Sequence, residues 1–252
     1  EKTKLCFRNS RVIETGLKHG TVTVVMDGHN LELTSFRVDG EYPDHRRPKK
    51  VTFTNKLALD LARRDFTVNA MAYSPETGII DLFGGKDDLN NKVIRCVGDP
   101  DKRFGEDALR ILRALRFSSV LDFRIEEKTA ASAIKNREDI KKISVERKFT
   151  ELKKLLSGKA CGRVLRDFRE IIISCVPFLS DAPEETYYRQ AELASKLRDP
   201  LLSFSAHLFP LGEERADEIC RALKTDNAFR KTCVFLIKNV GRDFVSRGDA
   251  LR

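Results

Sequence analysis

The spacing of apolar residues changes at about residue 84, and this change constrains the fold more than any other feature of the chain. Before it, residues 20–26 and 31–36 flank the sequence Asp-Gly-His-Asn, which predicts a β-hairpin. A second hairpin is predicted over 70–83 and a helix over 54–66. Beyond it, strand signals fade. The sequence therefore predicts the α+β class, with a small mixed unit followed by an all-helical arm.

Most of the chain after Gly-Gly-Lys-Asp-Asp at 84–88 has the period of an amphipathic helix. A short extended segment at 93–98 is the exception. Helices are predicted over residues 105–120, 126–137, 144–156, 160–174, 186–198, 213–224 and 227–239.

The balance of charge limits the kinds of partner. The chain has 47 Lys and Arg residues against 38 Asp and Glu residues, a formal net charge of +9, which favours nucleic acid or a membrane surface. No apolar run approaches ~20 residues, and no helix combines a basic face with aromatic anchors, so we expect no membrane partner. Six cysteines without a CxxC pair and four unclustered histidines predict reduced thiols in a cytoplasmic protein rather than a zinc site.

The sequence GEDALRILRALRF at 105–117 places charged and apolar residues in separate rows. Residues three apart are neighbours on a helix, and each step drifts by about 60° around it. The charged row contains Asp107, Arg110, Arg113 and Arg116, and the apolar row contains Leu109, Leu112 and Leu115. The apolar row predicts burial against other helices. The charged row predicts either a solvated helix face, whose ion pair contributes a few tenths of a kcal/mol, or a binding site.

Hydrogen-bond polarity indicates what such a binding site would recognise. Asp107 can only accept hydrogen bonds and Arg110 can only donate them. Cytosine and adenine present an amino donor beside a ring-nitrogen acceptor, whereas uracil and guanine present the reverse order. An Asp–Arg pair can therefore bond C and A and mispairs with U and G, at a cost of roughly 1–3 kcal/mol for each buried mispaired group.

A second charged segment, RRDFTVNAMAY at 63–73, adds groups that suit a nucleotide. Arg63 and Arg64 can hold phosphates, and Asp65 and Asn69, one helical turn apart, can receive a ribose hydroxyl. The alternative is a helix end with ordinary charge pairs.

Five ordered segments resemble the tRNA nucleotidyltransferase/poly(A) polymerase family, specifically its bacterial CCA-adding type. They are TGLKHGTVTVVMDGHNLELTSFRVDG (15–40), RRDFTVNAMAY (63–73), DLFGGKDDL (81–89), GDPDKRFGEDALRILRALRF (98–117) and SVERKFTELKKLL (144–156). The resemblance implies a polymerase-β-like nucleotidyltransferase head at 1–85, a helical neck at 86–157 and a helical body and tail at 158–252. It implies template-independent addition of C, C and A to the 3′ end of tRNA from CTP and ATP.

The resemblance also implies roles for individual residues. Asp107 and Arg110 stand in the EDxxR motif that reads the incoming base. Arg64 matches a triphosphate contact, and Asp65 lies near the ribose. Arg113 and Arg116 match further nucleotide-contacting arginines, and a neck-stabilising motif corresponds to Glu146, Arg147 and Glu151.

One motif of the family is absent from the sequence. A GGxVRD turn followed by a DxD strand should supply two carboxylates for two Mg²⁺ ions, and we expect that the chain lacks residues upstream of Glu1, and residues of the tail beyond Arg252. Glu32 matches a third acidic position of the head; its alternative is an exposed carboxylate on an amphipathic strand. The sequence does not indicate the oligomeric state of the protein.

The polar segment 37–50 is predicted to be a mobile loop that carries Asp39, Asp44, Arg46 and Arg47. In the family a loop here helps the switch from C to A, so its presence favours full CCA addition or A addition; the alternative is an ordinary disordered loop.

Three other functions stay open: a bacterial poly(A) polymerase, an A-adding tRNA nucleotidyltransferase, and a noncatalytic RNA-binding module that has lost its metal site. Basic residues of the arm are candidates for phosphate contacts along tRNA, although a solvated helix face is the favoured description of each of them individually. They are the segment 147–154 with Lys159, Arg163, Arg166 and Arg169.

Overall fold

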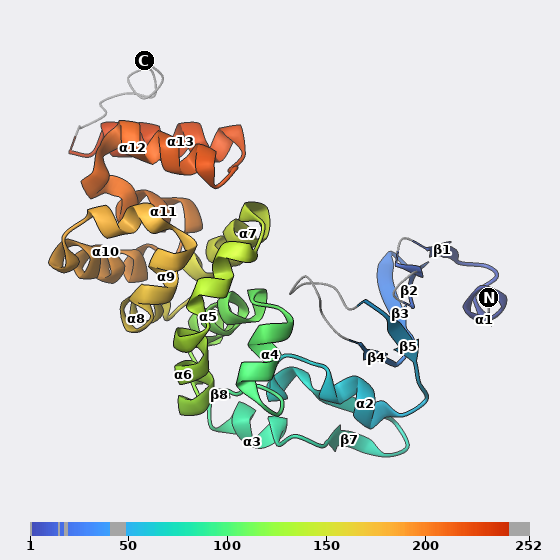
Figure 1. Ribbon diagram of the computed structural model, residues 1–252. Coiled ribbons are helices and arrows are strands. Elements are labelled where there is room, and N and C mark those ends of the chain that lie inside the picture. Colours follow the sequence, from blue (N-terminus) through green and yellow to red (C-terminus); the bar gives the residue numbers. More distant parts are fainter. Residues whose placement is uncertain (1, 15, 18–19, 41–48, 242–252) are drawn as a thin grey trace.

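A computed structural model describes residues 2–14, 16–17, 20–40 and 49–241 (Figure 1). The strand-containing part lies at one side, and the helices extend away from it in chain order to the C-terminal pair α12 and α13. The elements before the arm are α1 (Lys2–Cys6), β1 (Arg11–Ile13), β2 (Thr21–Met26), β3 (His29–Thr34), β4 (Arg37–Asp39), β5 (Val51–Phe53), α2 (Leu57–Ala62), the 3-10 turn η2 (Thr67–Asn69), β6 (Met71–Ser74) and β7 (Gly78–Asp81).

Both predicted hairpins are confirmed. β2 pairs with β3 antiparallel in a sheet of order β1-β2-β3, and Met26 lies opposite His29. The connection is therefore the two residues Asp27 and Gly28, both at positive φ (50° and 77°), as a hairpin turn with the right twist requires. β6 pairs with β7 in the same way.

The predicted loop at 37–50 is partly wrong, because its first three residues form β4. β4 pairs with β5, with Asp39 opposite Val51. Residues 41–48, which include Asp44, Arg46 and Arg47, lie outside the described residues.

The helix predicted over 54–66 is shorter than expected, since α2 ends at Ala62. The residues that follow pair with a segment distant in sequence. The N–H of Val97 donates to the carbonyl of Asp65 at 3.0 Å, and the N–H of Thr67 donates to the carbonyl of Arg95 at 3.0 Å. This non-local pairing competes with helix formation and buries Phe66 completely.

The Gly-Gly-Lys-Asp-Asp segment forms α3 (Gly85–Asn90) instead of a plain boundary. The carboxylate of Asp81 accepts the N–H groups of Gly85 at 2.9 Å and Lys86 at 2.8 Å, which satisfies the first donors of this helix. Beyond it, β8 (Val93–Ile94) pairs in parallel with β9 (Arg124–Ile125). The two short strands therefore hold together the ends of the segment between them, which contains α4 and α5.

The arm is helical, as predicted, and consists of α4 (Pro100–Glu106), α5 (Leu109–Leu121), α6 (Glu127–Lys135), the 3-10 segment η3 (Arg137–Lys142), α7 (Val145–Leu156), α8 (Cys161–Asp167), α9 (Arg169–Cys175), the 3-10 segment η4 (Pro177–Asp181), α10 (Glu184–Leu197), α11 (Pro200–Leu208), the 3-10 turn η5 (Phe209–Leu211), α12 (Gly212–Ala222) and α13 (Asn227–Lys238). The helix predicted over 160–174 is two helices that meet at Phe168. α11 was not predicted, because it is apolar around most of its circumference and so lacks a clear period.

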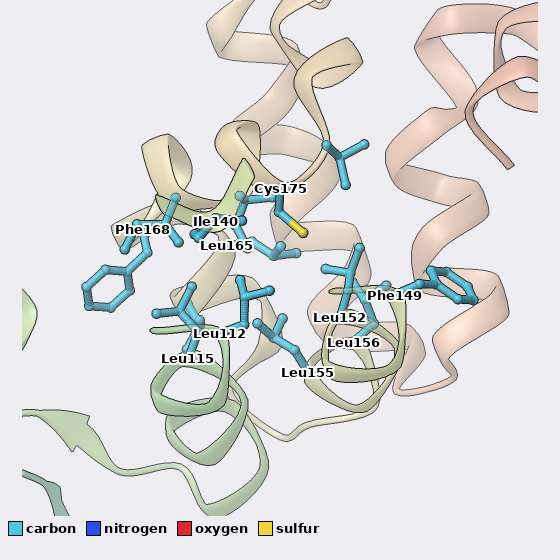
Figure 2. Packing of buried hydrophobic residues seen from close by; sticks show 14 of the residues in the cluster. Leu112, Leu115, Ile140, Phe149, Leu152, Leu155, Leu156, Leu165, Phe168 and Cys175 are labelled. Carbon is cyan, nitrogen blue, oxygen red and sulfur yellow. The ribbon is translucent and has the colours of Figure 1, made fainter. Parts of the chain in front are cut away.

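The apolar row of α5 is buried, as predicted. Figure 2 shows Leu112 and Leu115 of α5 in one cluster with three leucines of α7. Those three are Leu152, Leu155 and Leu156. Because α5 presents its apolar side to α7, its other side is available to face the strand-containing part.

Replacement of Leu115 tests this packing. Leu115 is 0% exposed, so Leu115→Ala should lower the free energy of unfolding by about 2–5 kcal/mol through lost burial and the cavity that remains. Leu121, on the same helix but 42% exposed, provides the control, and Leu121→Ala should change stability by less than ~1 kcal/mol. Urea unfolding measures both. Equal losses would show that α5 is not buried as described.

Candidate nucleotide-binding pocket

An open pocket of about 610 Å³ lies where the strand-containing part meets the first helices of the arm. Five arginines and three aspartates line it, a surplus of two positive charges. The lining residues are Thr34, Phe36, Asp60, Arg63, Arg64, Asp65, Asn69, Asp107, Leu109, Arg110, Arg113 and Arg147. Six of the predicted nucleotide-binding residues are thus brought together, and such a pocket suits a polyanionic ligand.

Asp107 lies in this pocket, but not on the helix predicted for it. Its backbone is extended (φ −147°, ψ 104°) between α4 and α5. One carboxylate oxygen accepts the N–H of Leu109 at 3.0 Å, and the other pairs with Arg147 of α7 at 3.0 Å. A short acceptor side chain that binds a nearby N–H favours a helix boundary over a helix interior, so the predicted continuous helix over 105–120 is wrong at this point.

Arg110 occupies the first turn of α5 and is fixed from three directions. Its guanidinium pairs with Glu106 at 2.6 Å and donates to the carbonyls of Arg103 at 3.1 Å and Arg63 at 3.2 Å. It therefore bridges α4, α5 and the turn after α2. Asp107 and Arg110 both face the pocket, although each is held by a different counter-charge.

Asp65 and Asn69 are neighbours, as predicted, although no helix joins them. The Asn69 amide donates to Asp65 at 3.4 Å. The other oxygen of Asp65 accepts from Nε of Arg113 at 2.7 Å, which connects α5 to the turn after α2. Arg64 donates to the Asn69 carbonyl at 3.2 Å and keeps a side chain that is 42% exposed. It can thus reach a ligand in the pocket.

Arg116 does not line the pocket. It pairs with Glu151 of α7 at 2.9 Å and lies 4.1 Å from the centre of the Phe117 ring. Burial lowers the pKa of its guanidinium, and Glu151 opposes that shift. The drift of the charged row around the helix explains the division: Arg110 and Arg113 face the pocket, and Arg116 faces α7.

The sequence reasoning missed one pocket carboxylate, Asp60, and did not place Arg147 among the nucleotide-binding residues. Asp60 precedes Arg63 and Arg64 by three and four residues on a predicted helix. That spacing brings side chains into contact, so it was the signal that could have identified Asp60.

Glu32 is exposed on β3 and does not line the pocket. It shares a face of the strand with Thr34, two residues on, which does line it. Among the residues that the structure describes, no three His, Cys, Asp or Glu side chains form a metal-binding group. These residues therefore form no Mg²⁺ site made of protein side chains alone.

Asp39, predicted as part of the loop, points back toward the pocket. It pairs with Arg37 at 3.1 Å and Arg63 at 3.6 Å, and its side chain is almost fully buried. The segment 37–39 is thus connected to the pocket by charge and by the hydrogen bond from the Arg37 N–H to Asp60.

Several of the candidate basic residues of the arm, Arg147 and Arg166 among them, have partners within the protein. Arg163 pairs with Asp122 at 3.3 Å, and Arg169 lies 5.2 Å from the Tyr187 ring.

Of the six cysteines, five are buried and Cys6 is exposed. Across the described part of the chain, no helix has the length and apolar character needed to cross a membrane.

The sequence and the fold of the chain match those of known proteins. Residues 1–95 match the family model "Poly A polymerase head domain", and residues 122–173 match "Probable RNA and SrmB- binding site of polymerase A". A CCA-adding enzyme of Lactobacillus helveticus is 42% identical over 240 residues, which are 94% of this chain and 60% of that protein. The chain belongs to the tRNA nucleotidyltransferase/poly(A) polymerase family.

Other members of this family support the same placement. A CCA-adding enzyme of Pediococcus pentosaceus is 49% identical over 157 residues, 62% of this chain and 40% of that protein. The solved Bacillus stearothermophilus CCA-adding enzyme in complex with CTP has a TM-score of 0.64 at 35% identity, over 92% of this chain and 55% of that chain. The predicted α+β fold with a nucleotidyltransferase head is thereby confirmed. The chain spans about 60% of the length of most of the curated relatives that it matches.

The position of Arg116 gives a testable prediction. Arg116→Gln should lower the free energy of unfolding by about 3 kcal/mol, because it leaves the carboxylate of Glu151 buried without its counter-charge. Arg124→Gln, at an exposed position of β9, should change stability by less than ~0.5 kcal/mol. Chemical denaturation measures both. Unchanged stability together with weakened nucleotide binding would instead place Arg116 at the nucleotide.

Proposed function

We propose that the chain is the nucleotide-selecting part of an enzyme that adds C, C and A to the 3′ end of tRNA from CTP and ATP, without a nucleic-acid template. The observation that carries the proposal is the pocket, which gathers Asp107, Arg110 and a set of arginines from three separate segments. CCA-adding relatives at 42% identity, and a solved relative described in complex with CTP, support the choice of substrates.

Base selection rests on Asp107 and Arg110. The carboxylate accepts the amino hydrogen of cytosine or adenine, and the guanidinium donates to the adjacent ring nitrogen. Arg147 and the N–H of Leu109 hold the two oxygens of Asp107 in a fixed orientation. An oxygen that accepts one hydrogen bond can accept a second, so these partners position Asp107 without preventing it from reading a base.

Phosphate and ribose are assigned to the other side of the pocket. Arg63, Arg64 and Arg113 supply positive charge for the triphosphate, and Asp65 with Asn69 receives a ribose hydroxyl. These residues bind and orient the nucleotide, and positioning with charge neutralisation is most of what phosphoryl transfer asks of a protein.

The metal requirement is proposed from the family. Divalent metal is general in CCA-adding nucleotidyltransferases, and Mg²⁺ would activate the attacking 3′-hydroxyl and the leaving pyrophosphate. Since the described residues do not form a Mg²⁺ site of their own, Glu32 is at most one contributor to it.

The acceptor end of tRNA would lie along the basic arm, part of which matches a family model named for RNA binding. A cytoplasmic location stays a prediction.

Nucleotide selection is testable by equilibrium binding of CTP, ATP, UTP and GTP. The chain should prefer CTP and ATP, and Asp107→Asn or Arg110→Gln should reduce the CTP-to-UTP preference at least about tenfold, since each mispaired polar group costs ~1–3 kcal/mol. Asp101→Asn is the control, because Asp101 pairs with Lys135 outside the pocket. An unchanged preference in both pocket variants would refute base reading, and poor binding of CTP by the parent chain would favour a poly(A) polymerase.

Turnover gives a separate prediction. The 252-residue chain should bind nucleotide weakly and should not incorporate CMP or AMP into a tRNA that ends before CCA, because its described residues lack the carboxylates that two Mg²⁺ ions need. Labelled-nucleotide incorporation with excess Mg²⁺ measures this. Any product above background would show that the metal ligands come from elsewhere in this chain.

A further inference from the structure

The carboxylate of Asp60 lies directly behind the two adjacent arginines of the pocket. It belongs to α2 and is 3% exposed. One oxygen accepts from Nε of Arg63 at 3.0 Å, from its Nη2 at 2.7 Å, and from the backbone N–H of Arg37 at 3.2 Å. The other oxygen pairs with Arg64 at 3.3 Å. A single buried carboxylate thus contacts both arginines and the first residue of β4.

We propose that Asp60 is a positioning residue for the polyphosphate of the bound nucleotide and acts through Arg63 and Arg64. The proposal rests on the proposed function, and it concerns a residue for which the sequence suggested no role.

Two guanidiniums side by side repel each other, and each long side chain loses rotamer freedom when a ligand fixes it. Asp60 offsets both costs before any ligand binds, because its charge lies between the two guanidiniums and its hydrogen bonds fix Arg63 at two nitrogens. Such preorganisation strengthens binding by reducing the ordering that the ligand must impose.

Arg63, which Asp60 holds, also contacts the base-selecting side of the pocket. The backbone carbonyl of Arg63 accepts from Arg110 at 3.2 Å, and the side chain of Arg63 pairs with Asp39 at 3.6 Å.

The Asp60 carboxyl has a pKa below its ordinary value. Burial raises this pKa, but hydrogen bonds from Arg63 and from the Arg37 N–H, together with the charge of Arg64, outweigh the effect of burial. Asp60 is therefore ionised at neutral pH.

The sign of one measurement separates positioning from bulk charge. Asp60→Asn raises the positive surplus of the pocket from two to three, so charge alone predicts tighter binding of a polyanion. Positioning predicts the opposite. We expect Asp60→Asn to weaken inorganic tripolyphosphate and CTP by the same factor, about tenfold, which corresponds to ~1.4 kcal/mol, and to leave the CTP-to-UTP preference unchanged. Calorimetric titration at low ionic strength, with ligand to millimolar concentration, measures these values.

Asp88→Asn is the matched control. Asp88 is also buried (6% exposed) and pairs with an arginine, Arg95, but it does not line the pocket. It should lose thermal stability as Asp60→Asn does and keep its tripolyphosphate affinity within about twofold. Asp60→Glu, which retains the charge, should recover part of the affinity. A purely structural role for Asp60 would move melting temperature and leave the affinity of the folded protein unchanged.

The remaining outcomes are distinct. Unchanged or tighter tripolyphosphate binding by Asp60→Asn would overturn the inference and leave the proposed function standing. If Asp60→Asn binds tripolyphosphate more weakly and the parent chain does not distinguish CTP from UTP, the inference is supported and base reading is rejected. A parent chain that binds neither tripolyphosphate nor CTP at millimolar concentration would overturn both.

Discussion

Two contacts connect the turn after α2 to α5, and the pocket depends on them: the ion pair between Asp65 and Arg113, and the hydrogen bond from Arg110 to the Arg63 carbonyl. α5 can make these contacts since its opposite side is fixed by apolar packing against α7. One helix thus takes part in the core and in the site at once. Close packing of its leucines defines where its arginines project, so core and pocket geometry are set together.

Charge balance explains why five arginines can line one pocket. Each is paired with a carboxylate. Arg63, Arg64 and Arg110 pair with a carboxylate three or four residues earlier, whereas the partners of Arg113 and Arg147, Asp65 and Asp107, come from another segment. Such pairs limit the repulsion among cations and fix the direction of each guanidinium. The small positive surplus that is left is available to a ligand, whereas an equal number of unpaired arginines would separate from one another.

Local sequence signals predicted the parts of the fold that local interactions determine. Asp27-Gly28 specified a hairpin turn, and the spacing of Leu109, Leu112 and Leu115 specified the buried side of α5. The errors arose where a distant partner or a side chain decided the backbone. Residues 65–67 leave the helical path to pair with 95–97, and Asp107 lies extended between two helices, where its carboxylate accepts the N–H of Leu109. The residues of the site were predicted largely from the family resemblance. Asp60 lies outside the family motifs, although its spacing to Arg63 and Arg64 on a predicted helix indicated a contact.

The parallel pairing of β8 with β9 encloses α4 and α5 between two fixed ends. Asp107 and Arg110 consequently belong to a segment whose two ends lie side by side. The side chains of this segment nevertheless contact residues outside it, since Arg113 pairs with Asp65 and Asp107 pairs with Arg147. A substitution on either side of these contacts therefore requires a matching change on the other, so the enclosed segment and its surroundings are constrained to vary together.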